Sequence, residues 1–169
     1  MKTPLIGQYE AMHDKGHFAG LSSLPYAGRI KELIDEYGAR TILDYGCGKG
    51  HQYSRHDMSA GWGVTVSLYD PAVPGFTGKP RKADGVVCID VMEHIEKKDV
   101  PAVLHKIFGL AGKFAFFVIC TRASKKMLPD GRNCHLTIEP PSWWGGVITE
   151  AMDRSKSDAQ MIAIYREGL

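Results

Sequence analysis

Apolar positions along the chain fall into two repeating patterns. Short, almost continuously apolar runs predict buried strands, and stretches in which apolar residues recur every three or four positions predict helices packed on those strands. The strand-like runs lie at residues 41–44, 64–70, 85–89, 113–120 and 160–166. The helix-like stretches lie at residues 25–37, 51–60, 100–110 and 140–153. Strands that alternate with helical crossovers predict an α/β fold, with a mostly parallel sheet and helices on both of its faces.

The first 24 residues carry no sustained helical or strand period and predict an ordered arm rather than a regular element. Residues 25–169 then form the core, and 169 residues fit a single domain without a separate substrate domain. Lys and Arg number 21 against 19 Asp and Glu, so the overall charge does not require a nucleic-acid or membrane partner. With no targeting segment and no apolar run of bilayer length, we expect a cytoplasmic protein.

Signals for disulfides and metals are weak. The four cysteines contain no C-x-x-C pair, which argues against a disulfide framework or a zinc cluster. His13 and His17 have the spacing that puts two imidazoles on one helical face, but Gly16 lies between them. We therefore expect no bound metal.

The glycine-rich stretch after the first predicted strand is the most informative part of the chain. An apolar run ends at Asp44 and is followed by Gly46, Gly48 and Gly50, which let the backbone turn tightly and approach a ligand. The second predicted strand ends at Asp70, near the ~20-residue offset at which a nucleotide-binding fold places a ribose-binding carboxylate. The alternative is a turn that only connects a strand to a helix. Together the two signals favour a nucleotide site.

In this stretch the chain resembles the class I S-adenosylmethionine-dependent methyltransferases, whose first motif is an acidic residue followed by x-G-x-G-x-G after the first strand. Asp44-Tyr-Gly-Cys-Gly-Lys-Gly matches that motif throughout, whereas nicotinamide and flavin enzymes place G-x-G-x-x-G there without the acid. Residues 83–96 also resemble the ubiquinone- and menaquinone-biosynthesis-like branch, in which the fourth strand runs into a Glu-His pair, here Glu93 and His94. The resemblance covers residues 40–120 and implies a Rossmann-like methyltransferase fold with S-adenosylmethionine as its cofactor.

Two places depart from the family pattern and predict a trimmed sheet. Only residues 71–82 separate the second predicted strand from the next, and their prolines disfavour the strand and helix that the family normally fits there. At the C-terminus the family closes its sheet with an antiparallel pair of strands. Here there is room for one such strand, at residues 160–166.

The resemblance implies a set of cofactor contacts at the carboxyl ends of the strands. Asp44, Gly46 and Gly48 would lie near the methionine end of the cofactor. Asp70 would accept hydrogen bonds from the ribose, and Asp90 would lie close to the sulfonium. The predicted cofactor-binding residues are Asp44, Gly46, Gly48, Gly50, Asp70, Pro71 and Asp90.

Two histidines are candidates for a catalytic general base. Methyl transfer from a sulfonium is an in-line displacement, so the protein mainly positions the acceptor and excludes water, and a base helps when the acceptor is a hydroxyl or an acid. His94 follows the strand at 85–89 and either acts as this base or orients its loop. His135, in the loop 121–139, is either a second candidate at the same rim or an exposed loop residue.

The remaining candidates would surround the acceptor. The N-terminal arm would fold over the cleft as a lid and exclude water, or it would pack elsewhere. Trp143 would contact an aromatic acceptor or anchor the core, and Arg122 belongs to a basic loop that favours an acidic acceptor or is simply solvated. The predicted acceptor-binding residues are Tyr9, His13, His17, Phe18, Arg122 and Trp143.

Three functions remain open at this point. The first is S-adenosylmethionine-dependent methylation of a small, acidic metabolite. The second is methylation of nucleic acid or a nucleotide through the basic residues of the loop 121–139. The third is a non-catalytic subunit that binds S-adenosylmethionine or regulates a partner, an alternative raised by the trimmed sheet. Oxygen, nitrogen and carbon acceptors share one donor site, and the sequence carries no mark of oligomeric state, so the acceptor atom and the assembly stay open.

Overall fold

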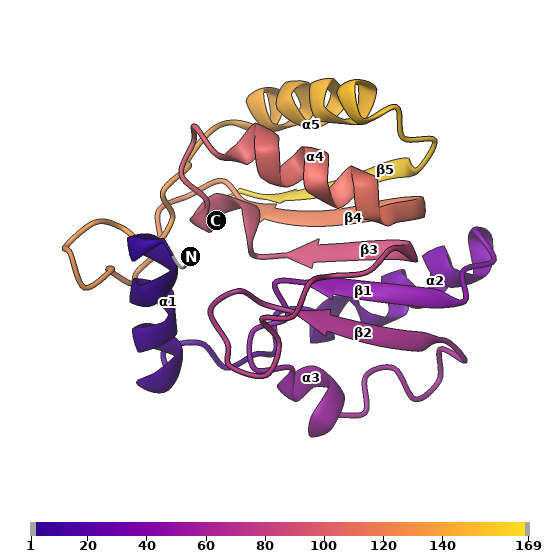
Figure 1. Cartoon of the computed structure of the whole chain (residues 1–169), viewed down its shortest axis with the longest axis horizontal. Coiled ribbons are helices and arrows are strands. Elements are labelled where there is room, and N and C mark those ends of the chain that lie inside the picture. The colour runs from indigo at the N-terminus through magenta and orange to yellow at the C-terminus, as the bar shows by residue number, and fades with distance from the viewer. Residues whose placement is uncertain (1–2, 168–169) are drawn as a thin grey trace.

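A single sheet of five parallel strands forms the centre of the computed structural model, which describes residues 3–167. The strand order is β2-β1-β3-β4-β5 (Figure 1). From β1 the chain first adds β2 on one side and then β3, β4 and β5 on the other. The gap between β1 and β3 is therefore a topological switch point, where open α/β sheets bind ligands. The strands are β1 Thr41–Tyr45, β2 Thr65–Tyr69, β3 Ala83–Ile89, β4 Ala111–Cys120 and β5 Gln160–Arg166. This arrangement confirms the Rossmann-like α/β fold.

Helices cover both faces of the sheet. α2 packs on one face and α4 and α5 pack on the other, while α1 stands beyond the carboxyl ends of the strands (Figure 1). The α-helices are α1 Pro4–Asp14, α2 Ala27–Glu36, α3 His51–Ser54, α4 Val100–Leu110 and α5 Pro141–Ser155, and the 3-10 turns are η1 Leu24–Tyr26 and η2 Met92–His94. Within residues 3–167, every helix is too short or too polar to cross a bilayer.

The strands send alternate side chains into two apolar cores. In β4, Phe114, Phe116 and Val118 pack with residues of α2, whereas Phe117 and Ile119 pack with residues of α4 and α5. All five side chains are fully buried. Because both faces of β4 are covered from Phe114 onward, its sequence is apolar without alternation from Phe114 to Cys120, as expected for an inner strand of a parallel sheet.

The N-terminal arm contains a regular helix that the hydrophobic pattern does not predict. Thr3 caps α1, because its Oγ1 accepts a hydrogen bond from the Ile6 amide (3.4 Å), and a proline occupies the first turn. Met12 packs with Leu128 and Cys134, and the latter is 122 positions away in the sequence. The prediction of an irregular arm is wrong because the partners of α1 lie in a distant loop, which leaves no local periodicity to detect.

Two further expectations are corrected by the structure. The helix expected over residues 51–60 is a single turn, because α3 ends at Ser54 and Asp57 adopts a left-handed conformation (φ 45°). β5 runs parallel to β4 rather than antiparallel, because the long α5 carries the chain back to the starting edge of the strands before β5 begins. Residues 71–82 contain no helix or strand, as their prolines predict.

Packing at one central glycine gives a direct test of the sheet. A Cβ at Gly85 would lie 2.3 Å from Phe114 Cζ and 2.7 Å from Ile42 Cδ1, so Gly85→Ala should lower the free energy of unfolding by about 1–3 kcal/mol. In the matched control Gly109→Ala, in α4, the new Cβ meets nothing within 4 Å, and stability should rise by about 0.5–1 kcal/mol. Urea unfolding followed by circular dichroism measures both changes. A Gly85→Ala variant as stable as the wild type would contradict this packing.

Candidate functional site

The glycine turn after β1 is shaped by close packing on both sides. The amides of Gly46 and Cys47 both donate to the Tyr69 carbonyl at the end of β2, at 2.7 and 3.1 Å. Gly46 has φ 88°, and a Cβ there would lie 2.2 Å from Val91 Cγ2. Only glycine tolerates both the left-handed backbone and this close contact. The turn after β1 is thus packed against the end of β2, through Tyr69, and against the residue after β3, through Val91.

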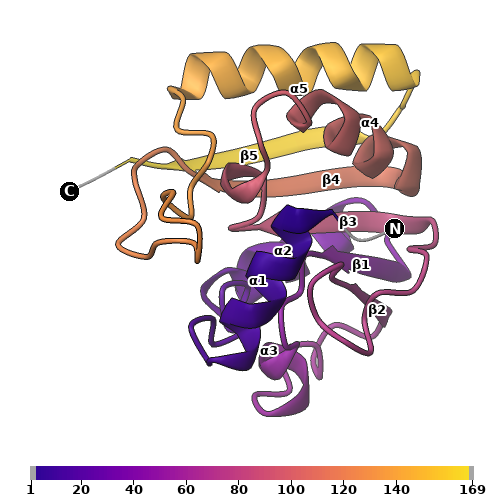
Figure 2. The ribbon, with the colours of Figure 1, turned by 60° about the vertical axis from the view of Figure 1, so that its left-hand side comes forward.

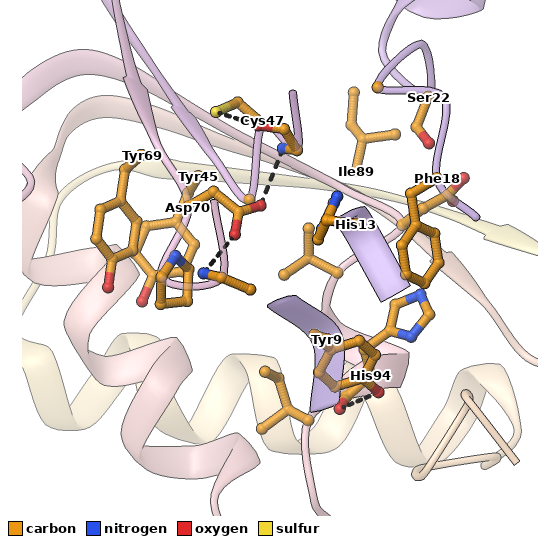
Figure 3. A pocket seen from close by; sticks show the side chains of 18 of the residues that line it. Tyr9, His13, Phe18, Ser22, Tyr45, Cys47, Tyr69, Asp70, Ile89 and His94 are labelled. Carbon is orange, nitrogen blue, oxygen red and sulfur yellow. Dashed lines mark hydrogen bonds between the residues drawn. The ribbon is translucent and has the colours of Figure 1, made fainter. Parts of the chain in front are cut away.

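Asp70 is the carboxylate that faces this turn. Its Oδ2 accepts a hydrogen bond from the Gly48 amide (2.9 Å), and its Oδ1 accepts one from the Ala72 amide (2.8 Å), as Figure 3 shows. The side chain is almost completely buried. Each carboxylate oxygen can accept more than one hydrogen bond, so Asp70 is fixed by the backbone and still has acceptor capacity for a ligand.

Asp44 lies behind the turn rather than in front of it. Its Oδ2 accepts hydrogen bonds from Tyr53 Oη (2.9 Å), Gln52 Nε2 (3.1 Å) and Ser23 Oγ (3.4 Å). Burial raises the pKa of Asp44 to about 6, although these three donors act in the opposite direction. Asp44 is outside the residues that line the cleft and braces the turn from behind, and its contact with the cofactor stays a prediction.

A cleft of about 620 Å³ opens in front of the turn, at the switch point of the sheet. The end of β2 contributes Asp70 and Pro71, and the end of β3 contributes Asp90. α1 and the segment that follows it close the cleft from the opposite side, and Figure 2 shows α1 lying across the ends of the central strands. A volume of this size lies within the range of small-molecule and cofactor sites. Gly50 is not among the residues that line the cleft, and a Cβ at this position would point toward Leu68 and Phe76.

Asp90 combines an unusual backbone with an ion pair. It has φ 55°, which is uncommon for a residue with a side chain and is typical of functional positions. Its Oδ1 is paired with the guanidinium of Arg166 from β5. Burial raises the pKa of the Asp90 carboxyl, and the charge of Arg166 opposes this effect. The cleft thus has a carboxylate and guanidinium pair at this edge.

The two predicted histidines lie together, but only one of them lines the cleft. His94 does so, and its Nδ1 lies 2.9 Å from the Cys134 carbonyl, so Nδ1 donates and Nε2 is the acceptor nitrogen. Burial lowers the pKa of His94 to about 4, which keeps the ring neutral. The His135 ring lies 4.9 Å away, centroid to centroid, and is nearly perpendicular to it. His135 lies behind His94, outside the residues that line the cleft, and its catalytic role stays a prediction.

The arm residues divide in a similar way. Tyr9, His13 and Phe18 line the cleft, and the His13 and Phe18 rings lie 4.9 Å apart, centroid to centroid (Figure 3). His17 lies outside the lining with an exposed side chain, and its carbonyl accepts from Lys126 Nζ (2.6 Å). α1 ends before His17, so the pair of histidines does not share a helical face.

Trp143 and Arg122 both lie outside the residues that line the cleft, and Trp143 follows the core-anchoring alternative. Trp143 packs edge-to-face on Trp144 and carries the Lys97 ammonium 5.2 Å above its ring, which places it in the apolar layer of α5 rather than at the cleft. Arg122 is outside the lining as well, and its carbonyl lies 2.6 Å from His135 Nδ1.

Several residues of the site were not predicted. Tyr45 and Tyr69 line the cleft with their ring centroids 4.8 Å apart, and the Lys106 ammonium lies 4.9 Å from the Tyr69 centroid and 5.6 Å from the Tyr45 centroid. Both tyrosines immediately precede residues of the nucleotide signal, so their position in the sequence could have marked them. Lys126 also lines the cleft, with its ammonium 4.5 Å from the Phe18 centroid.

Comparison with known proteins gives a family match for most of the chain. A family model described as a methyltransferase domain matches residues 19–158. A solved O-methyltransferase family protein from Burkholderia thailandensis is similar over 78% of this chain and 52% of its own length, with a TM-score of 0.44 and 15% sequence identity. This chain thus spans about half the length of that protein. None of the curated proteins compared matches the chain.

The hydroxyl of Tyr9 gives a test of how α1 is held. The Tyr9 hydroxyl lies 2.8 Å from the Cys134 carbonyl oxygen and 3.1 Å from the His94 carbonyl oxygen. Tyr9→Phe keeps the ring but removes this hydrogen bonding, which is worth about 1 kcal/mol. Trypsin should then cleave at Lys15, just after α1, about fivefold faster, because the open form is more populated. Tyr165→Phe, on β5, is the control and should leave that rate unchanged. Equal cleavage of wild type and Tyr9→Phe would show that this hydroxyl does not hold the helix.

Proposed function

The chain belongs to the methyltransferase domain family, and on that premise we propose that its cleft binds S-adenosylmethionine and directs the methyl group to a small acceptor held under α1. The main support for the proposal is the Asp70 carboxylate, whose Oδ2 lies 2.9 Å from the Gly48 amide nitrogen at the switch point of the sheet. A carboxylate that can accept from ribose hydroxyls beside the backbone of Gly46 and Gly48 is the arrangement that a nucleoside ligand with an amino-acid tail requires.

The residues present fit this cofactor. Gly46 and Gly48 leave a surface on which only backbone approaches the ligand, and Asp70 retains acceptor capacity for ribose hydroxyls. The Asp90 carboxylate, ion-paired with Arg166, lies at the end of β3, on the side where a sulfonium would lie. Tyr45 and Tyr69 offer flat apolar surface close to Asp70 and would serve the base in place of the missing third strand.

The acceptor end of the cleft favours a small molecule with an apolar or aromatic body. Tyr9 and Phe18 face this end from the arm, and Ile95 lines it from the segment after β3. α1 and the segment after it line the cleft from the side opposite the glycine turn, which favours an acceptor small enough to fit under this helix. These contacts support a metabolite rather than nucleic acid as the acceptor.

An acidic group on the acceptor is also part of the proposal. Among the described residues that line the cleft, Lys126 is the one with an ammonium or guanidinium side chain, and it lies beside the Phe18 ring. Arg132 does not compete for an anion, because Glu96 and Asp130 each hold it at 2.9 Å. A carboxylate or phosphate at the edge of an aromatic acceptor would therefore face Lys126.

His94 would act as the general base for a hydroxyl or acidic acceptor. The Cys134 carbonyl fixes the proton on Nδ1, so Nε2 is free to accept a proton as the acceptor attacks the methyl carbon. When bound, S-adenosylmethionine supplies a methyl group already activated by the sulfonium charge. The protein therefore contributes proton removal at one nitrogen, alignment of the two reactants, and exclusion of water by α1.

The role of Asp70 is tested by binding. Asp70→Asn should weaken the affinity for S-adenosylmethionine and for S-adenosylhomocysteine by a similar factor, about 10- to 100-fold, because both ligands carry the ribose and a charge-assisted hydrogen bond is lost. The asparagine oxygen still accepts one of the two backbone amides, which preserves the fold. Asp158→Asn, at an exposed position, is the control for isothermal titration calorimetry. Unchanged affinity of Asp70→Asn for both ligands would contradict ribose binding at this carboxylate.

The role of His94 is tested by kinetics. His94→Gln should lower kcat by about 10²- to 10⁴-fold while leaving the affinity for S-adenosylhomocysteine unchanged, because a general base acts only on the chemical step. Protonation removes the base, so in the wild type the acid limb of kcat/KM should fall near pH 4, following the lowered pKa, and not near 6.5. An acid limb near pH 6.5, or a loss of less than tenfold in kcat, would count against His94 as the base.

A further inference from the structure

A second group of polar side chains lies outside the cleft and has no part in the proposed methyl transfer. It consists of Glu93 from η2, Cys120 at the end of β4 and His135 from the loop 121–139. A carboxylate oxygen, the thiol sulfur and an imidazole nitrogen of these residues all lie within 4.8 Å of one another. Three segments far apart in the sequence thus bring three different ligand types to one point.

The carboxylate of Glu93 is the least explained group in this cluster. Glu93 is fully buried, and its Oε1 accepts a hydrogen bond from the Cys120 amide (3.1 Å). Its Oε2 is buried and has no hydrogen-bond partner within residues 3–167. The nearby guanidinium of Arg166 is paired with Asp90 instead. A buried oxygen without a partner is costly, which indicates a ligand or an ion at this position.

The other two residues each have a lone pair that a metal ion could use. His135 Nδ1 lies 2.6 Å from the Arg122 carbonyl, so Nδ1 carries the proton and Nε2 has its lone pair available. An outer carbonyl that fixes the tautomer of a histidine in this way is the usual companion of a metal-bound imidazole. Cys120 is buried, and its sulfur has a long contact of 3.9 Å with the same carbonyl.

We propose that Glu93, Cys120 and His135 bind a borderline-soft divalent metal ion of the Zn²⁺ type. One oxygen, one nitrogen and one sulfur ligand suit Zn²⁺, whereas Ca²⁺ and Mg²⁺ require oxygen ligands only. Ligand atoms around tetrahedral zinc lie about 3.3–3.8 Å apart, so the cluster contracts by about 1 Å on binding, and the cysteine thiol releases its proton to solvent. Three protein ligands leave the fourth position open for water.

Such an ion would join the three segments that flank His94. η2 contains His94 itself, and the loop 121–139 holds His94 Nδ1 through the Cys134 carbonyl. The site goes beyond the proposed methyl transfer and does not depend on it, because the binding test needs neither S-adenosylmethionine nor an acceptor. Its predicted effect is a more stable loop, measured as a rise in melting temperature with the metal.

The test titrates the full chain with Zn²⁺ and, separately, with Co²⁺. The wild type should bind one equivalent of Zn²⁺ with a rise in melting temperature, and the Co²⁺ form should show a thiolate-to-metal absorption band in the near ultraviolet. Cys120→Ser should abolish that band, and Glu93→Gln and His135→Gln should each weaken Zn²⁺ binding at least tenfold. His105→Gln, at an exposed position on α4, is the matched control and should leave binding unchanged.

Two outcomes would overturn the proposal. One is a wild type that binds no metal, and the other is metal binding that Cys120→Ser, Glu93→Gln and His135→Gln all leave unchanged. Circular dichroism of each variant without metal separates loss of a ligand from loss of the fold. If Cys120→Ser does not fold, Cys120→Ala takes its place, and the Co²⁺ spectrum of the wild type alone still decides whether a thiolate is a ligand.

Discussion

The hydrogen bond from the Gly48 amide to the Asp70 carboxylate is the interaction on which the site depends. It joins the turn after β1 to the end of β2 across the point where the strand order changes direction. Two further amides of the turn donate to the carbonyl of Tyr69, so turn and strand end form one unit. Glycine is required in this turn because Val91 occupies the space of a side chain at Gly46. A fixed carboxylate beside bare backbone is thereby presented to the cleft.

The other sides of the cleft are formed by a short loop after β2 and by α1. Residues 71–82 form no helix or strand, so β2 is followed directly by the loop that contributes Pro71 and Ala72 to the cleft. α1 lies across the strand ends, where Tyr9 and Lys126 tie it and the following segment to the loop 121–139 and to η2. If α1 acts as the proposed lid, binding and release of ligands depend on the stability of these contacts.

Sequence alone was sufficient where the signal is local. The strands, the helices that cover the sheet, and the glycine turn with Asp70 all follow from periodicity, turn residues and spacing along the chain. It was insufficient where a position is set by distant contacts: α1 packs on a loop more than a hundred positions away, and Trp143 turns into the α5 layer. His135 and Glu93 became part of one cluster only because two crossovers bring η2 and the loop 121–139 together. Asp44 keeps its place in the motif but braces the turn from behind.

The most direct test of the central claim is a nuclear magnetic resonance titration of the chain with S-adenosylhomocysteine, which reports each backbone amide separately. We expect the largest shifts at the amides of Gly46, Gly48 and Ala72, which line the cleft beside Asp70. Shifts should saturate at one equivalent of ligand. A well-folded chain whose spectrum does not change, or changes only at residues far from this turn, would contradict the claim that the turn and Asp70 hold the nucleoside.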